Sequence, residues 1–84
     1  MQTLFLDGAR YRTPLELHTA LRAMLSLPDY YGMNADALHD CLSERKEPVH
    51  IRIVSAGEGD VARSLSAVCA VVEDLGGSVR EVGS

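Results

Sequence analysis

The sequence contains no tryptophan, one phenylalanine and only two cysteines among its 84 residues. Cys41 and Cys69 are too few and too widely spaced for a disulfide framework or a C-x-x-C metal site. Each falls among the apolar positions of a predicted helix, so we expect both to be core thiols. The N-terminal apolar run Leu4-Phe5-Leu6 follows no positive charge and is far too short for a signal peptide or a membrane span. We therefore expect a cytoplasmic protein with no membrane contact.

The sequence also lacks an excess of positive charge, because its formal net charge is −4. That balance argues against binding of nucleic acid and allows a basic protein as a partner through electrostatic steering. A chain of this length forms one domain, residues 1–84, whose core is too small to enclose a deep catalytic pocket. We therefore expect a functional site on the surface.

A strand over residues 2–6 is predicted at the start of the chain, ending at the turn signal Asp7-Gly8. The segment Thr13-Pro14-Leu15-Glu16 then offers a capping box with proline at the first helical position. The first helix is therefore predicted to begin at Pro14, and its apolar periodicity ends at Leu27-Pro28.

The middle of the chain is predicted to contain a loop over residues 28–33, a second helix and a strand. Asn34 is a suitable N-cap for this helix, which would end at about Arg45. In the strand over residues 49–54, apolar and polar side chains alternate. One face of this strand should be buried and the other partly wet, as on an edge.

The last third is predicted to form a helix capped by Asp60 and running to Leu75, where Gly76-Gly77 supplies a stop, and a strand over residues 79–82. The resulting order is β-α-α-β-α-β. Long helical crossovers between strands favour a parallel arrangement. The predicted fold class is therefore α/β, with a three-stranded parallel sheet packed by about three helices.

Three acidic residues lie on one side of the second predicted helix. At about 100° per residue, Asp36, Asp40 and Glu44 form one stripe opposite the apolar side of this helix. Like charges at this spacing destabilise a helix, which suggests a function for the stripe. A solvated face partly offset by Arg45 and Lys46 is the simpler interpretation, and the stripe alone leaves both open.

Two of the three tyrosines stand just before this helix, in Leu27-Pro28-Asp29-Tyr30-Tyr31-Gly32, and paired aromatics beside charges are typical of a binding hot spot. Residues 27–42 fit the pattern L-P-x-Y-Y-G-x-N-x-D-A-L-x-D-C-L. This stretch strongly resembles the barstar family of ribonuclease inhibitors. The stretch that carries the resemblance runs from Leu17-His18 to Leu42, about a third of the chain, and elsewhere only the order of elements matches.

The resemblance implies a barstar-like fold and one-to-one blockade of a basic, barnase-like extracellular ribonuclease before its export. Asp40 matches the family's central inhibitory aspartate, and Asp36 matches a second aspartate that faces the cationic rim of the enzyme. Such an enzyme holds the scissile phosphate with cationic side chains, so a carboxylate on a rigid helix can occupy the phosphate site. Tyr30 matches a contacting aromatic, and Asn34 matches a position of the loop and cap.

Some residues depart from the family pattern. His39 stands where the namesake inhibitor has tryptophan, and Ser43-Glu44-Arg45 replaces a Thr-Gly-Trp stretch, so we expect His39 and Glu44 to face a different target surface. The resemblance also implies an acidic contact late in the last long helix. We assign it to Glu73, with the neighbouring Asp74 as the alternative.

An enzyme is one alternative, because Asp36, His39 and Asp40 could supply an acid, a base or a metal ligand. His39 and Asp40, however, diverge by about 100° on a helix, and no H-E-x-x-H motif or phosphate-binding loop is present. We therefore expect no catalytic residue, metal or cofactor. His18 and His50 are expected at the surface of a helix and on the polar face of a strand.

An acidic immunity or regulatory module for a different basic protein is the second alternative. It predicts the same acidic surface but no inhibition of barnase-like ribonucleases, and the sequence alone does not separate the two functions.

Overall fold

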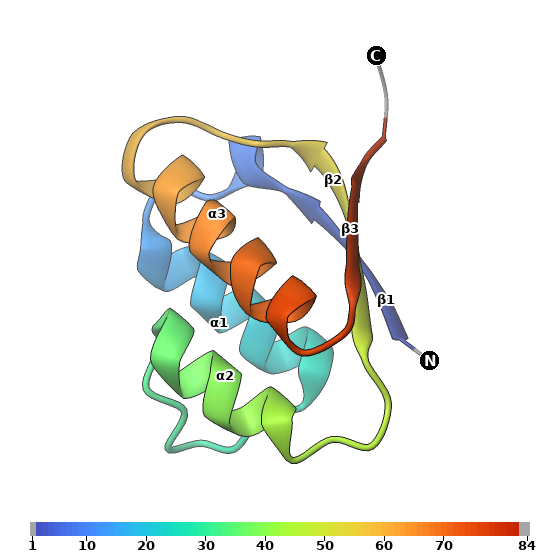
Figure 1. The fold of residues 1–84 in the computed structure, drawn as a ribbon. Helices are drawn as coiled ribbons and strands as arrows, with labels where there is room; N and C mark the ends of the chain where they lie inside the picture. Colours follow the sequence, from blue (N-terminus) through green and yellow to red (C-terminus); the bar gives the residue numbers. More distant parts are fainter. Residues whose placement is uncertain (1, 83–84) are drawn as a thin grey trace.

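Three parallel strands form the sheet in the computed structural model, which describes residues 2–82. They are β1 (Gln2–Asp7), β2 (Val49–Ser55) and β3 (Ser78–Glu81), paired in the order β1-β2-β3 (Figure 1). Leu4 pairs with Ile51, which pairs with Val79 on its other side. The expectation that β2 lies at an edge is therefore wrong. β2 is central, and its alternation arises because only one face of the sheet is covered.

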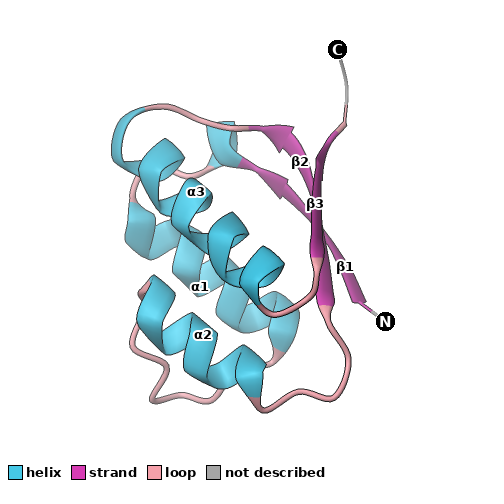
Figure 2. Ribbon diagram, viewed as in Figure 1, coloured by secondary structure: helices cyan, strands magenta, loops and turns pink. Residues whose placement is uncertain are grey.

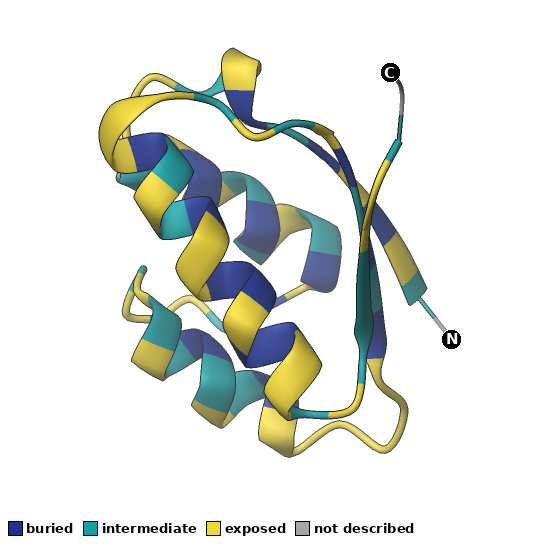
Figure 3. Ribbon diagram, turned by 45° about the horizontal axis from the view of Figure 1, so that its top comes forward, coloured by how far each residue is buried: buried dark blue, intermediate teal, exposed yellow. Residues whose placement is uncertain are grey.

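All three α-helices cover the same face of the sheet, as two views show (Figures 1 and 3). They are α1 (Pro14–Leu25), α2 (Ala35–Ser43) and α3 (Gly59–Asp74), and a short 3-10 helix, η1 (Gly8–Arg10), follows β1. α2 lies farthest from the sheet, after the long loop that leaves α1 (Figure 2). The predicted order β-α-α-β-α-β and the parallel α/β class are confirmed.

The predicted start of α1 is confirmed, whereas the predicted end of α2 and the predicted start of α3 are corrected. Thr13 Oγ1 accepts a hydrogen bond from the Glu16 N–H at 3.2 Å. α2 ends at Ser43 rather than near Arg45. α3 begins one residue before Asp60, so Asp60 is not its cap; its carboxylate instead pairs with Arg63 inside the first turn.

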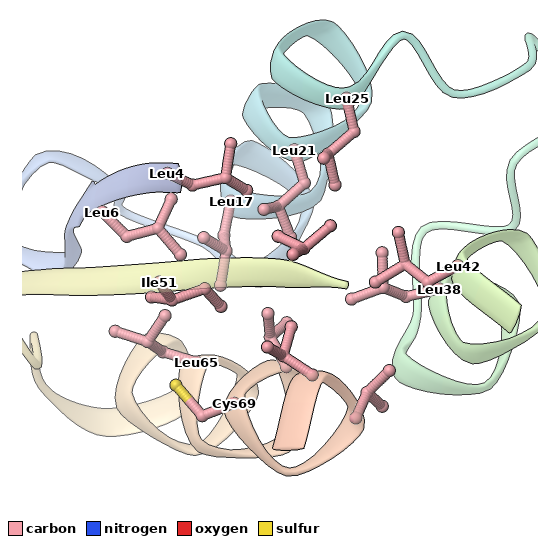
Figure 4. Close-up of a cluster of buried hydrophobic side chains, with 14 of the residues drawn as sticks. Leu4, Leu6, Leu17, Leu21, Leu25, Leu38, Leu42, Ile51, Leu65 and Cys69 are labelled. Atoms are coloured by element: carbon pink, nitrogen blue, oxygen red, sulfur yellow. The ribbon is translucent and has the colours of Figure 1, made fainter. Parts of the chain in front are cut away.

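The core lies between the sheet and the helices, and leucines from each of α1, α2 and α3 contribute to it (Figure 4). Seven of its side chains are almost completely buried: Leu6, Leu17, Leu21, Leu38, Ile51, Leu65 and Val68. Burial of each such side chain stabilises the fold by about 1.5 to 3 kcal/mol. Leu38 matters most for the site, because it is fully buried and anchors α2 in the core.

The stop predicted at Gly76-Gly77 is confirmed. Gly76 adopts a φ of 90° and donates to the Glu73 carbonyl at 3.1 Å, while Gly77 donates to the Val72 carbonyl at 2.9 Å. These two bonds are those of a Schellman motif. A Cβ on Gly77 would overlap the Val49 carbonyl oxygen, so this glycine lets the end of α3 approach β2 closely.

We predict different costs for alanine at the two glycines. In Gly77→Ala the new Cβ must displace the backbone of β2, so the free energy of unfolding should fall by about 3 kcal/mol or more, the upper end of the cost of overpacking. Gly76→Ala meets no atom within 4 Å. It should cost only the left-handed backbone penalty of about 1 to 2 kcal/mol. Urea unfolding of both variants measures the difference, and an equal loss would contradict the close approach.

Candidate partner-binding surface

The acidic residues of α2 lie on its solvent side. Asp36, Asp40 and Glu44 are exposed, whereas Leu38 and Leu42 on the opposite side are 0% and 6% exposed. Asn34 begins the helix, because its Oδ1 accepts from the Ala37 N–H at 2.8 Å. The acidic stripe is therefore mounted on a helix that is capped at one end and fixed by two core leucines.

The stripe is not neutralised by the cations that follow it. Among residues 2–82, no ion pair involves Asp36, Asp40 or Glu44. Arg45 turns away to the end of α1, where its guanidinium donates to the Leu25 carbonyl. A cation there also interacts favourably with the α1 dipole. The positive charge of Arg45 is thus used to hold α1, and the stripe keeps its negative charge.

The two adjacent tyrosines have opposite positions. Tyr30 is 87% exposed beside α2, whereas Tyr31 is 4% exposed and belongs to the core. The Tyr31 hydroxyl lies 2.6 Å from His18 Nδ1 and donates to the Asn34 carbonyl at 3.3 Å. The loop is therefore tied at Tyr31 to α1 and to the start of α2, while the ring of Tyr30 is exposed to solvent.

The expectation of a surface position for His18 is wrong, because this side chain is 3% exposed. His18 precedes Leu21 and Leu25 by three and seven residues, a helical spacing that carried the signal for burial. The tautomer with its proton on Nδ1 satisfies both bonds of the network: the imidazole donates to Tyr31, and the tyrosine hydroxyl donates to Asn34.

Burial also sets the protonation of this pair. It lowers the pKa of His18. Burial, with a smaller effect of nearby Cys41, raises the pKa of Tyr31 to about 12. Both shifts favour the neutral forms. The loop is therefore held by a hydrogen bond between neutral groups at neutral pH.

His39 links α2 to the end of α3. Its Nε2 lies 3.0 Å from Asp74 Oδ2, and the ring is half-buried. Glu73 is exposed and lines a groove on the β3 side of α3, together with Cys69 and Val79. Of the two acids at the end of α3, Asp74 is thus the one brought into contact with α2.

A shallow hollow lies between the loop and the end of α2, lined by Ser26, Leu27, Pro28, Tyr30, Cys41, Glu44 and Arg45. Cys69 is buried as expected, but Cys41 is only half-buried and borders this hollow. Cys41 points to the side of α2, between its apolar and acidic faces, so it packs against the core without being enclosed by it.

No group of three metal-ligating side chains converges within the described part of the chain. His50 is half-buried on β2, where its Nδ1 lies 2.7 Å from Ser78 Oγ on β3. None of the helices between residues 2 and 82 is both long and apolar enough to span a membrane.

We predict that His18 makes stability depend on pH. Since its folded pKa is lowered, the unfolded chain takes up the proton first as pH falls. The free energy of unfolding should therefore decrease below about pH 6.5, by at most about 1.4 kcal/mol per pH unit, until the folded pKa is passed. His18→Gln keeps a donor for Tyr31 but cannot titrate. Urea unfolding between about pH 5 and 7.5 should show a weaker pH dependence in this variant; identical slopes would contradict the assignment.

We predict that a thiol reagent modifies Cys41 before Cys69 in the native protein. Cys41 is partly accessible, whereas Cys69 is buried, and burial together with Glu73 raises the pKa of its thiol. Mass spectrometry of Cys41→Ala and Cys69→Ala variants assigns each rate. Equal protection of both thiols in the native state would contradict the partial accessibility of Cys41.

Comparison with known proteins gives the family of this fold and surface. The family described as Barstar (barnase inhibitor) matches residues 1–82. A Bacillus subtilis (strain 168) protein named "Putative ribonuclease inhibitor YrdF" is 44% identical over 43 residues, which are 51% of this chain and 47% of that relative, so the match spans about half of its length. The family description is that of an inhibitor rather than an enzyme, in agreement with the expectation of a non-catalytic protein. The chain belongs to the barstar family.

Proposed function

We propose that this protein inhibits a barnase-like microbial ribonuclease by placing the acidic side of α2 and the loop over residues 28–33 in the active site of the enzyme. The unneutralised carboxylates of Asp36 and Asp40 beside the exposed ring of Tyr30 carry this proposal. The family and the name of the Bacillus subtilis relative support it.

Asp40 is the centre of the proposed contact. A ribonuclease that cleaves a phosphodiester holds the phosphate with cationic side chains, and these form short, charge-assisted hydrogen bonds with a carboxylate. Asp40 lies between Leu38 and Leu42, which fix the helix to the core. Its carboxylate is therefore presented on a rigid support, and little conformational entropy is lost when it binds.

The surrounding residues have distinct roles in this proposal. Asp36 faces the cationic rim, and Tyr30 supplies the aromatic contact. Glu44 meets the partner beside the hollow, and Asn34 keeps the loop and helix in register through its capping bond. His39 contacts the partner from the middle of α2.

The acid at the end of α3 completes this surface. Glu73 was assigned from the resemblance alone, and it lies on the β3 side of the helix. The contact between Asp74 and His39 favours Asp74 as the contributor next to α2. Glu73→Ala and Asp74→Ala distinguish the two candidates, because only the substitution of the residue that contacts the enzyme should weaken inhibition.

The complex would be one-to-one, because one inhibitor surface fills one active site, and inhibition would protect the bacterial cytoplasm before the enzyme is exported. An immunity or regulatory module for another basic protein is the second candidate. His39 favours it, because this residue with its Asp74 partner occupies the middle of the surface where the namesake inhibitor has tryptophan. That exchange changes the shape presented to a target.

We predict that Asp40→Ala weakens inhibition by about a hundredfold or more, because the cations of the enzyme then stay buried without a partner. Asp36→Ala should cost less and act mainly on the association rate at low salt. Residual RNA cleavage by purified barnase-like ribonucleases measures both effects, and thermal unfolding checks that the variants remain folded.

Asp60→Ala is the matched control, because Asp60 occupies the same second position of α3 that Asp36 occupies in α2. It removes the same charge from an exposed first turn and should leave inhibition nearly unchanged. Equal small losses of inhibition from all three substitutions would contradict the active-site plug and indicate diffuse electrostatic attraction instead. Absence of inhibition with every ribonuclease would favour the immunity or regulatory module.

A further inference from the structure

The face of the sheet opposite the helices is uncovered in the part of the chain that the structure describes (Figure 1). Its apolar side chains are conspicuous, because Phe5 is 63% and Val54 53% exposed. Phe5 pairs with Arg52, which pairs with Arg80 on the next strand, so the three side chains form one row across the sheet. Neighbouring strands are about 4.8 Å apart, which places an aromatic ring and two guanidinium groups side by side.

The arginines of this row are not paired with acids. Among residues 2–82 no ion pair involves Arg52 or Arg80, and Arg52 donates only to the backbone carbonyl of Ile51. Like charges directly opposite each other in a sheet are destabilising. A bound anion between the two guanidinium groups would remove this repulsion and satisfy donors that are suited to phosphate oxygens.

The chemistry of this row sets the kind of ligand that it can bind. The two guanidinium groups are suited to anionic oxygens, and the exposed ring of Phe5 is suited to a flat apolar group beside them. A second copy of the chain would instead have to present the acidic side of α2 together with Tyr30. Concentration-dependent self-association that Arg52→Gln abolishes, without binding of an oligonucleotide, would indicate that occupant.

We propose that the open sheet face binds single-stranded RNA. A base stacks on Phe5, and the adjoining phosphates bind Arg52 and Arg80. Sheets that bind single strands combine exposed aromatic rings with arginines in this way, and stacking requires bases that are not held in a duplex.

The net charge of −4 argues against a general affinity for nucleic acid, but the charges are separated in the fold. The acidic helix α2 lies on the far side of the molecule from the open face, in a protein whose extents are 32 × 24 × 18 Å (Figure 1). The Debye length is about 8 Å at physiological salt, so the repulsion from α2 is largely screened. The two surfaces can also be occupied at the same time.

Fluorescence anisotropy with a labelled single-stranded oligoadenylate tests the proposal. Two phosphate contacts predict that the logarithm of the binding constant falls with the logarithm of salt concentration with a slope of about −1.4. Arg52→Gln or Arg80→Gln should reduce this slope to about −0.7. Phe5→Leu should keep the slope and weaken binding about tenfold, because stacking is lost. Double-stranded RNA should bind more weakly than the single strand.

The absence of binding, or binding that survives in the double variant of Arg52 and Arg80, would overturn the proposal. Equal affinity for poly-glutamate, with no effect of Phe5→Leu, would also overturn it and indicate an acidic polypeptide. The test is independent of ribonuclease inhibition: Asp40→Ala should still bind the oligonucleotide, and Arg52→Gln should still inhibit the enzyme.

Discussion

The buried hydrogen bond between His18 and Tyr31 fixes the surface on which the proposed function depends. It fastens the loop to α1, and the same tyrosine hydroxyl reaches the carbonyl of Asn34, where α2 begins. Tyr31 is buried and its neighbour Tyr30 is exposed. The contact of Tyr31 with α1 and with the start of α2, together with the Asn34 cap and the burial of Leu38, therefore fixes the loop and the helix that carries Asp40.

The separation of charge is the second constraint. An unpaired acidic stripe destabilises α2, and a nine-residue helix is too short to be stable alone. Burial of Leu38 and Leu42 offsets this cost. Arg45 could have neutralised the stripe but instead binds the carbonyl of Leu25, so the fold uses this cation for packing and leaves the carboxylates available to a partner.

The sequence predicted what is encoded locally. Asn34 as a cap and Gly76-Gly77 as a stop need only the neighbouring residues, and helical crossovers dictate parallel strands. What it missed depends on distant contacts. The helical spacing of His18 indicated its burial, but the partner that satisfies its buried ring nitrogen, Tyr31, lies thirteen residues later. The direction of Arg45 likewise depends on the end of α1. The acidic stripe was found by periodicity, but its lack of neutralisation is a property of the tertiary structure.

The most direct test of the active-site plug is competition with a mononucleotide that occupies the phosphate site of a barnase-like ribonuclease. The affinity of this protein for the enzyme would be measured at increasing nucleotide concentration. If the carboxylate of Asp40 takes the place of the phosphate, the apparent dissociation constant should rise in proportion to the nucleotide concentration without reaching a plateau. An affinity that does not change, with a ternary complex of enzyme, nucleotide and inhibitor, would contradict the account.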